Sequence, residues 1–181
     1  MSSIALDNRW MRDMFDSVCS RYNILNKIIT FGQDALWRNR VLDMVKVDRQ
    51  TRILDICTGT GDLALKIAKK FPYVKTYAID FSARMLALVK KRAAGQGIKN
   101  IFLKENDCRS MEFDSSYFDY ITVSFGFRNL SYSKNNLKES LKEIHRVLKD
   151  GGRFIILETS QPINKFIKKF FHFYAGRIVP G

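Results

Sequence analysis

Apolar residues recur at helical spacing through the first part of the chain, from about Asn8 to Val45. One apolar face of this stretch is formed by Met11, Phe15, Val18, Tyr22, Leu25 and Ile29. The segment Phe31-Gly32-Gln33-Asp34 interrupts the pattern. Gly32 is expected to be the C-cap of one helix and Asp34 the N-cap of the next. The pattern therefore predicts two helices before residue 46.

From residue 52 onward, short apolar runs alternate with amphipathic segments. Strands are expected over residues 52–57, 75–80, 100–104, 117–125 and 153–158. Helices are expected over residues 63–71, where Pro72 ends the helix, and from the N-cap Ser82 to the glycines at 95 and 97. A further amphipathic helix carries Leu137, Leu141, Ile144 and Leu148, and Asp150-Gly151-Gly152 ends it. This alternation predicts a mostly parallel sheet with helices on both faces.

Composition narrows the class of protein. The 181 residues, 46% of them hydrophobic, suffice for one domain with a sizeable core. No apolar run approaches the length of a membrane span, and the first residues do not resemble a secretion signal. These features favour the cytoplasm. Cys19, Cys57 and Cys108 are too few for a disulfide framework and are expected to be mostly buried thiols. His145 and His172 stand apart from them, so we expect no metal site.

The formal net charge of +13 indicates a surface that attracts polyanions. Nucleic acid and anionic lipid both fit this property, and so does a basic compositional bias with no partner. Composition does not choose among these three.

One segment carries candidate chemistry. A predicted strand runs through Asp55 into Thr58-Gly59-Thr60-Gly61 and then into a helix. Glycines there let a ligand approach the main chain closely, at the end of the sheet where such folds bind ligands. Asp80, at the end of the next predicted strand, can accept hydrogen bonds from the ribose hydroxyls of an adenosine ligand. The same glycines also fit a dinucleotide pattern, so NAD is an alternative ligand.

Several further segments give a more specific resemblance. Four of them follow one another along the chain: Leu54 to Asp62, Asp80-Phe81-Ser82 with Met85-Leu86, Ser124-Phe125-Gly126-Phe127-Arg128-Asn129, and Arg146 to Arg153. Earlier come Met14-Phe15-Asp16-Ser17-Val18, Arg21-Tyr22-Asn23 and Phe31-Gly32, and Leu157 to Pro162 continues the match. Together they closely resemble the ubiquinone/menaquinone biosynthesis methyltransferases.

The resemblance implies a class I S-adenosylmethionine-dependent methyltransferase fold, Rossmann-like, with the last two strands missing. It divides the chain into a helical cap (1–47), an α/β core that binds S-adenosylmethionine (48–161) and the start of a basic aromatic segment (162–181). The implied reaction moves a methyl group to a ring carbon of a polyprenyl quinol. Asn23, Cys108 and Asp150 depart from the family pattern, which weakens any acid-base role for position 23.

Site residues follow from the same resemblance. Thr60 and the backbone at Gly59 and Gly61 would hold the methionine end of the cofactor, Asp80 the ribose, and Asp107 and Cys108 the adenine. Ser124 would lie near the sulfonium. The cofactor-binding residues are Asp55, Thr58, Gly59, Thr60, Gly61, Asp80, Phe81, Asp107, Cys108 and Ser124.

Arg128 and Asn129 would face the quinol, with Arg128 stabilising a phenolate and Asn129 orienting a ring oxygen. Tyr22 is a weaker candidate for proton relay and is also compatible with a core position. The segment from Lys165 to Val179 mixes aromatic residues with four basic ones. It is expected either to contact the cytoplasmic face of an anionic membrane or to cover the substrate. A homodimer is compatible with the sequence.

Three other functions compete with this interpretation. The first is a methyltransferase that acts on nucleic acid or on another small molecule, or a basic RNA-binding module, as the charge would suit. The Asn/Asp-Pro-Pro-aromatic clamp typical of base methylators is missing after the fourth predicted strand, no RNA-binding motif is visible, and no nucleic-acid partner is expected. The second is an NAD-linked dehydrogenase, but this sequence contains no Tyr-x-x-x-Lys pair that could serve as its catalytic residues. The third alternative is an inactive fragment that only binds the cofactor.

Overall fold

The computed structural model describes residues 33–130 and 134–158. Cys19, Tyr22, Asn23, Gly32 and the segment 162–181, for which the sequence made predictions, lie outside these residues, and the division into three parts stays a prediction.

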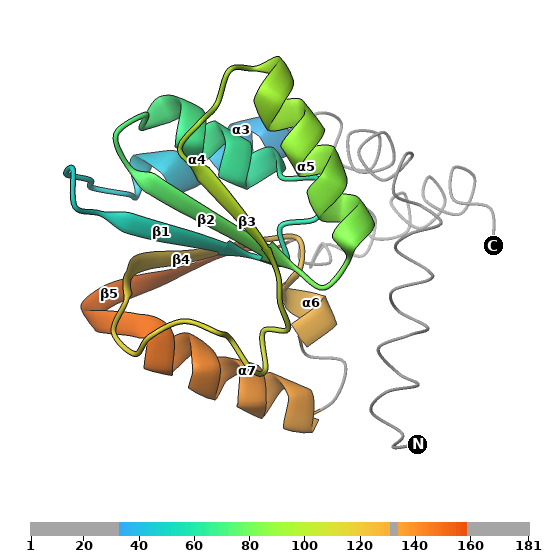
Figure 1. The fold of residues 1–181 in the computed structure, drawn as a ribbon. Helices are drawn as coiled ribbons and strands as arrows, with labels where there is room; N and C mark the ends of the chain where they lie inside the picture. The colour runs from blue at the N-terminus through green and yellow to red at the C-terminus, as the bar shows by residue number, and fades with distance from the viewer. Residues whose placement is uncertain (1–32, 131–133, 159–181) are drawn as a thin grey trace, which may run out of the picture.

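A parallel sheet forms the centre of the described fold (Figure 1). Its strands are β1 (Arg52–Ile56), β2 (Lys75–Asp80), β3 (Ile101–Glu105), β4 (Phe118–Ser124) and β5 (Leu148–Leu157). They lie in the order β3-β2-β1-β4-β5, and every neighbouring pair is parallel. The chain leaves β1 first toward one edge and later returns to its other side. The carboxyl ends of β1 and β4 therefore flank the topological switch point, where such sheets bind ligands.

Helices cover both faces of this sheet, as the alternation predicted. In Figure 1, α3 (Asp34–Asp43), α4 (Asp62–Lys70) and α5 (Ala83–Gly95) lie on one face, and α6 (Phe127–Leu130) and α7 (Lys134–Val147) on the other. Side chains alternate along β1, so Ile53 joins the core under α3 and α4, whereas Leu54 and Ile56 join the core on the face of α7. Both cores are thus anchored on one central strand.

One of the two helix N-caps that were predicted from the local sequence is found in the structure. Ser82 caps α5 as predicted, because its hydroxyl accepts a hydrogen bond from the Met85 N–H at 3.2 Å. Asp34 is not the N-cap of α3, as we had expected: Gln33 occupies that position. Asp34 lies in the first helical turn, where its buried carboxylate pairs with Arg38 one turn later. Asp34 therefore forms an ion pair within the helix instead of capping it.

The predicted end of α7 was also wrong. The helix ends at Val147, and Leu148 begins β5 by pairing with Phe118. Asp150-Gly151-Gly152 lies inside β5, where the register between β4 and β5 shifts and Gly151 has a φ of +74°. The glycines therefore form a bulge in a strand rather than a turn after a helix. The four-residue helix α6 had no sequence signal of its own.

Candidate active site

Two adjoining cavities open at the carboxyl ends of β1, β2, β3 and β4. The narrower one, of about 40 Å³, is lined by Arg38, Asp55, Cys57, Thr58, Gly59, Thr60, Asp62, Leu63, Asp80, Phe81, Met85, Ser124, Phe125, Gly126 and Asn129. The larger one, of about 510 Å³, extends beside the loop after β3 and contains Asp107, Cys108 and Arg109 in its wall. Cys57, Asp80, Phe81 and Asn129 line both. A long ligand can therefore extend from one cavity into the other.

The glycine turn after β1 has a backbone that few other residues would adopt. Gly59 and Gly61 have φ angles of +54° and +79°. Gly61 is also the N-cap of α4, and a Cβ built there would lie 2.7 Å from a methyl group of Val89 on α5. Arg92 of α5 donates a 2.5 Å hydrogen bond to the Thr60 carbonyl. The turn is thus fixed by packing and hydrogen bonding from α5.

Asp55 lies beneath this turn and is almost fully buried. Its carboxylate accepts hydrogen bonds from Thr122 Oγ1 at 2.6 Å and Thr58 Oγ1 at 2.7 Å. Burial raises the pKa of Asp55 to about 6, although the two hydroxyls and the charge of Arg38 act to lower it. The floor of the narrow cavity therefore carries a carboxylate that ionises near neutral pH.

Asp80 connects the ends of β1 and β2. One carboxylate oxygen accepts the Gly59 N–H at 2.8 Å and the other accepts the Ser82 N–H at 2.9 Å. The side chain lines both cavities while remaining buried. A carboxylate has about four lone-pair sites in all, so a side chain of this type at the cavity wall is chemically suited to accept from vicinal hydroxyl groups of a ligand.

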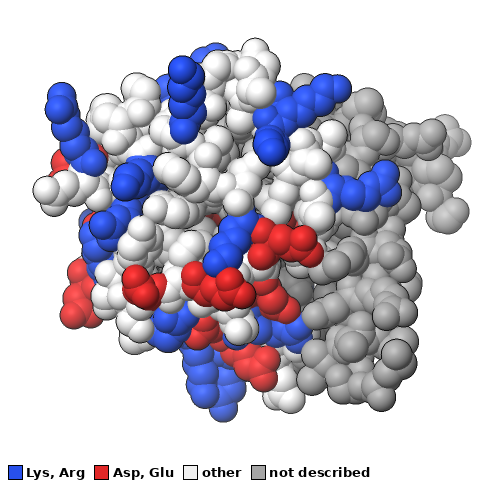
Figure 2. Space-filling model, in the orientation of Figure 1, with Lys and Arg blue, Asp and Glu red and all other residues white. Residues whose placement is uncertain are grey.

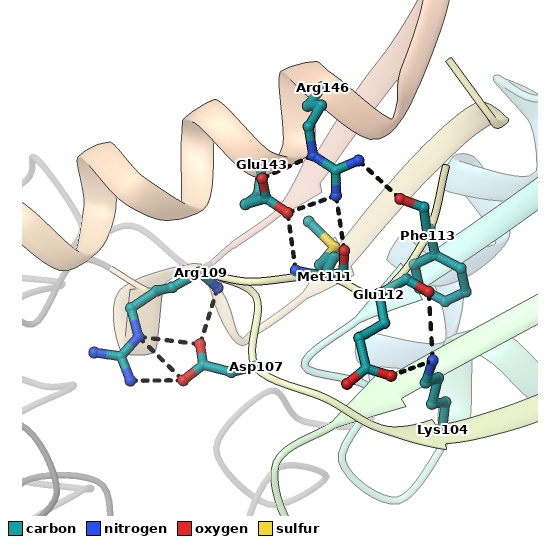
Figure 3. A network of polar contacts seen from close by, with 8 residues as sticks. All are labelled: Lys104, Asp107, Arg109, Met111, Glu112, Phe113, Glu143 and Arg146. Atoms are coloured by element: carbon teal, nitrogen blue, oxygen red, sulfur yellow. Dashed lines mark hydrogen bonds and ion pairs between the residues drawn. The ribbon is translucent and has the colours of Figure 1, made fainter. Parts of the chain in front are cut away.

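The loop after β3 is held from both sides (Figure 3). Arg146 of α7 donates to the carbonyls of Met111 at 2.7 Å and Phe113 at 2.8 Å, and Glu143 accepts the Met111 N–H at 2.9 Å. Nearer the cavity, the Arg109 guanidinium forms a hydrogen-bonded ion pair with the Asp107 carboxylate, with a shortest contact of 2.6 Å. The wall of the larger cavity is therefore anchored to α7.

Arg38 is a site residue that the sequence did not predict. Its guanidinium is only 4% exposed, pairs with Asp34, lies 3.7 Å from Asp62 and stacks 5.1 Å above the Phe125 ring. It lines the narrow cavity beside the glycine turn. Arg38 belongs to a helix that precedes the α/β pattern, and the local sequence indicates a pairing with Asp34 four residues earlier but not a place in a ligand site. Only the fold brings it to the site.

Two buried polar atoms of the narrow cavity have no hydrogen-bond partner within the described part of the chain. They are Arg38 Nε and Ser124 Oγ. A buried polar atom without a partner costs about 1–3 kcal/mol, a cost that a polar ligand can relieve. These atoms indicate that the cavity is shaped to receive polar groups.

Most of the predicted site residues meet here. Asp55, Thr58, Gly59, Thr60, Asp80, Phe81 and Ser124 line the narrow cavity, and Asp107 and Cys108 line the larger one. Gly61 supports the turn without lining either cavity. Asn129 borders both, whereas Arg128 is exposed on α6 and lines neither. Within the described ranges, no cluster of three or more His, Cys, Asp or Glu side chains is arranged to hold a metal ion.

Comparison with known proteins identifies the family. Residues 3–181 match the model of the ubiE/COQ5 methyltransferase family. The chain belongs to the ubiE/COQ5 methyltransferase family. The ubiquinone/menaquinone biosynthesis C-methyltransferase UbiE of Geotalea daltonii is 39% identical over 94% of this chain and 72% of its own length. The demethylmenaquinone methyltransferase of Thermus thermophilus is 36% identical over 92% of this chain and 74% of its own length.

Structural comparison agrees with the ubiE/COQ5 assignment at the level of the fold. A SAM-dependent methyltransferase from Aquifex aeolicus has a TM-score of 0.65 and 20% identity, covering 85% of this chain and 87% of its own. The resemblance drawn from sequence segments is confirmed, as are the Rossmann-like fold and the expected enzyme class, an S-adenosylmethionine-dependent methyltransferase.

Proposed function

We propose that this chain transfers a methyl group from S-adenosylmethionine to a ring carbon of a polyprenyl quinol in menaquinone or ubiquinone biosynthesis. The names of the relatives support the substrate class, since they refer to ubiquinone/menaquinone biosynthesis and to demethylmenaquinone. The observation that carries the proposal is the pair of cavities at the switch point, where an acidic floor and a glycine turn meet.

The charges of the site favour S-adenosylmethionine over a dinucleotide. Asp55, Asp62 and Asp80 line the narrow cavity beside the glycine turn. Figure 2 shows acidic side chains gathered where β3 ends, and Glu105, Asp107 and Glu112 line the larger cavity. A cationic sulfonium and ammonium suit such a site, whereas the pyrophosphate of NAD would meet carboxylates.

The residues present fit the parts of this cofactor. Arg38 pairs with Asp34, but its buried Nε has no partner within the described residues, and a hydrogen bond from this atom to the methionine carboxylate would satisfy it. Asp80 would accept the two ribose hydroxyls, and Asp107 and Cys108 would border the adenine in the larger cavity. Ser124 would face the region of the sulfonium. When bound, the cofactor supplies an electrophilic methyl group.

Arg128 and Asn129 are assigned to the quinol. A phenol of pKa ~10 needs about 4 kcal/mol to ionise at neutral pH, and ionisation makes the neighbouring ring carbon nucleophilic. A fixed cation at Arg128 would stabilise the phenolate as it forms, with water accepting the proton, because an arginine does not itself act as a base. Asn129 borders both cavities and would orient the ring oxygen.

The surface is consistent with a substrate that resides in a membrane. The net charge is +13, and the segment from Lys165 to Val179 combines aromatic with basic residues. Within the part of the chain that the structure describes, no helix has the length and apolar character to cross a bilayer. Peripheral contact with anionic lipid would bring the isoprenoid tail to the site.

Methyl transfer to demethylmenaquinol and to a demethylated ubiquinol precursor tests the proposal directly. We expect Arg128→Ala to lower kcat by 100-fold or more while the Kd of S-adenosylmethionine changes less than about threefold. Arg49→Ala, which removes another exposed arginine, is the matched control. Transfer to neither quinol would overturn the proposed substrate. Normal turnover in Arg128→Ala would overturn only the role of Arg128.

A further inference from the structure

Cys57 and Cys108 form a pair of free thiols inside the candidate site. Cys57 follows β1 and Cys108 follows β3, yet their sulfur atoms lie 3.8 Å apart. Both are unpaired by disulfide, Cys57 is half-buried and Cys108 is 7% exposed. The two residues are 51 positions apart in the sequence, so only the fold makes them neighbours.

The pair faces the larger cavity, and Cys57 also borders the narrow one. Small molecules that enter the site therefore meet both cysteine residues in its wall. Asp80 and Phe81, at the end of the intervening strand β2, line the same cavities, so the thiols lie in the wall that contacts the proposed cofactor. A covalent change at this pair would alter that wall.

We propose that Cys57 and Cys108 are a two-electron redox site, which a peroxide converts to a disulfide, and that this disulfide and the cofactor exclude one another. The second half rests on the proposed function, and the first half does not. A disulfide needs the sulfurs at about 2.05 Å, so they must approach by roughly 1.8 Å from their contact distance.

The chemistry balances with peroxide as the oxidant. Cys57, the more accessible thiol, attacks one peroxide oxygen as its thiolate, breaks the O–O bond and becomes a sulfenic acid, with release of water. The Cys108 sulfur then attacks the Cys57 sulfur, an S–S bond forms, and the hydroxyl leaves as a second water. The two thiols lose two electrons and two protons in all, and the peroxide is reduced to two waters.

The surroundings of Cys57 make this reaction slow. The contact with Cys108, burial, and the carboxylates of Asp80 and Asp55 raise the pKa of Cys57 well above its ordinary value. Only the thiolate reacts, so oxidation is expected to be faster at about pH 9 than at pH 7. The site would therefore respond to sustained oxidant and stay reduced otherwise.

Closing the disulfide would disturb the cofactor site through tightly packed backbone. Cys57 has a φ of +50°, uncommon for a residue with a side chain, and its Cβ lies 2.7 Å from where a Cβ on Gly126 would be. It has little room to move without shifting the glycine turn that follows it. Movement of Cys108 would pull the loop that carries Asp107.

The test uses the full chain with Cys19→Ser, which leaves only the two thiols of the pair. After treatment with hydrogen peroxide, intact-mass analysis should show a loss of about 2 Da, and peptide mapping should place the link between Cys57 and Cys108. The affinity for S-adenosylmethionine, measured by calorimetry, should fall at least tenfold and return after reduction. In a thiol–disulfide buffer at equilibrium, saturation with the cofactor should lower the fraction of chain that carries the disulfide, because the coupling between the two is reciprocal.

Cys57→Ser and Cys108→Ser, each in the Cys19→Ser background, are the matched controls and should give no link. The proposal is overturned if peroxide leaves both thiols unchanged, if it adds oxygen without joining them, or if the disulfide forms while the affinity stays the same. Failure of the reduced chain to bind the cofactor would instead count against the proposed function, since the mass measurement does not depend on binding.

Discussion

At the scale of single residues, burial decides how the charged groups of the site behave. Asp55 and Arg38 are both almost fully buried, and each borders the narrow cavity. Burial opposes ionisation of the aspartate, whose pKa rises to about 6, while the guanidinium pairs with Asp34. The narrow cavity therefore contains the Arg38 guanidinium beside a carboxylate whose pKa is raised to about 6.

Arg38→Gln should weaken binding of S-adenosylmethionine by about 10- to 100-fold, the loss of one charged hydrogen bond to the cofactor carboxylate. Methylthioadenosine, which lacks the amino-acid part, should bind the variant and the unchanged chain equally. Arg92→Gln is the control, because Arg92 braces the turn from α5 without lining the cavity. Equal losses for both ligands in Arg38→Gln would show that Arg38 only supports the structure.

The titration of Asp55 predicts a pH dependence of stability. Its folded pKa of about 6 exceeds the value of ~3.9 for an unfolded aspartate, so the folded state binds the proton more tightly. The contribution of Asp55 to the unfolding free energy therefore falls as pH rises from about 4 to 6 and is constant above.

We expect the unfolding free energy of Asp55→Asn, relative to that of the unchanged chain, to rise by roughly 2 to 3 kcal/mol between pH 4 and pH 7. Denaturant unfolding at both pH values measures this difference and cancels the titration of the other groups. A difference that is independent of pH would mean that Asp55 is already ionised at pH 4.

At the scale of elements, the site is assembled from the ends of strands and the helices beside them. Asp80 links the ends of β1 and β2, Arg92 of α5 holds the glycine turn, and Arg146 of α7 holds the loop after β3. Each connection joins segments that are distant in the chain. Changes in helix packing should therefore reach the site without any contact to the ligand.

Gly59 and Gly61 of the same turn allow the stability cost of backbone conformation to be distinguished from that of close packing. Both Gly59 and Gly61 have positive φ, but an added Cβ meets nothing within 4 Å at Gly59 and Val89 at 2.7 Å at Gly61. Gly59→Ala should cost about 1–2 kcal/mol from conformation alone. Gly61→Ala should cost a further 1–3 kcal/mol from overpacking.

Denaturant unfolding of the two variants measures the difference between their stability costs. Adding Val89→Ala to Gly61→Ala should relieve part of the overpacking cost. Equal costs at the two positions would argue against the close packing of α4 on α5.

At the scale of the whole molecule, charge is distributed unevenly. Acidic side chains gather at the carboxyl end of β3, whereas Lys and Arg are spread over the rest of the described face (Figure 2). An excess of 13 positive charges then acts over the surface as a whole. This arrangement suits an enzyme that attracts an anionic surface while keeping an acidic site for a cationic cofactor.

The full chain should bind vesicles that contain anionic phospholipid, and should not bind neutral ones. Replacing Lys165, Lys168 and Lys169 by Gln should weaken binding by about 100-fold, at about 1 kcal/mol per basic residue. The charge-matched control replaces the exposed Lys69, Lys75 and Lys99 by Gln. Co-sedimentation measures both, and equal losses would assign the attraction to net charge instead of to the segment from Lys165 to Val179.

The sequence by itself determined the order of elements and predicted many of the residues that line the two cavities. Strand β2 was predicted to the residue, and Ser82 was correctly predicted as a cap. This worked because a strand buried on both faces and an N-cap are local patterns of hydrophobicity and hydrogen bonding. The glycine turn and Asp80 were found for the same reason, since each follows directly on a recognisable strand.

Tertiary structure decided what depends on contacts between distant segments. The start of β5 at Leu148 follows from pairing with Phe118 on β4. Arg38 enters the site from a helix outside the α/β pattern, and Cys57 meets Cys108 across β2. No periodicity along the chain encodes these meetings, because they arise only when the sheet brings the carboxyl ends of its strands together.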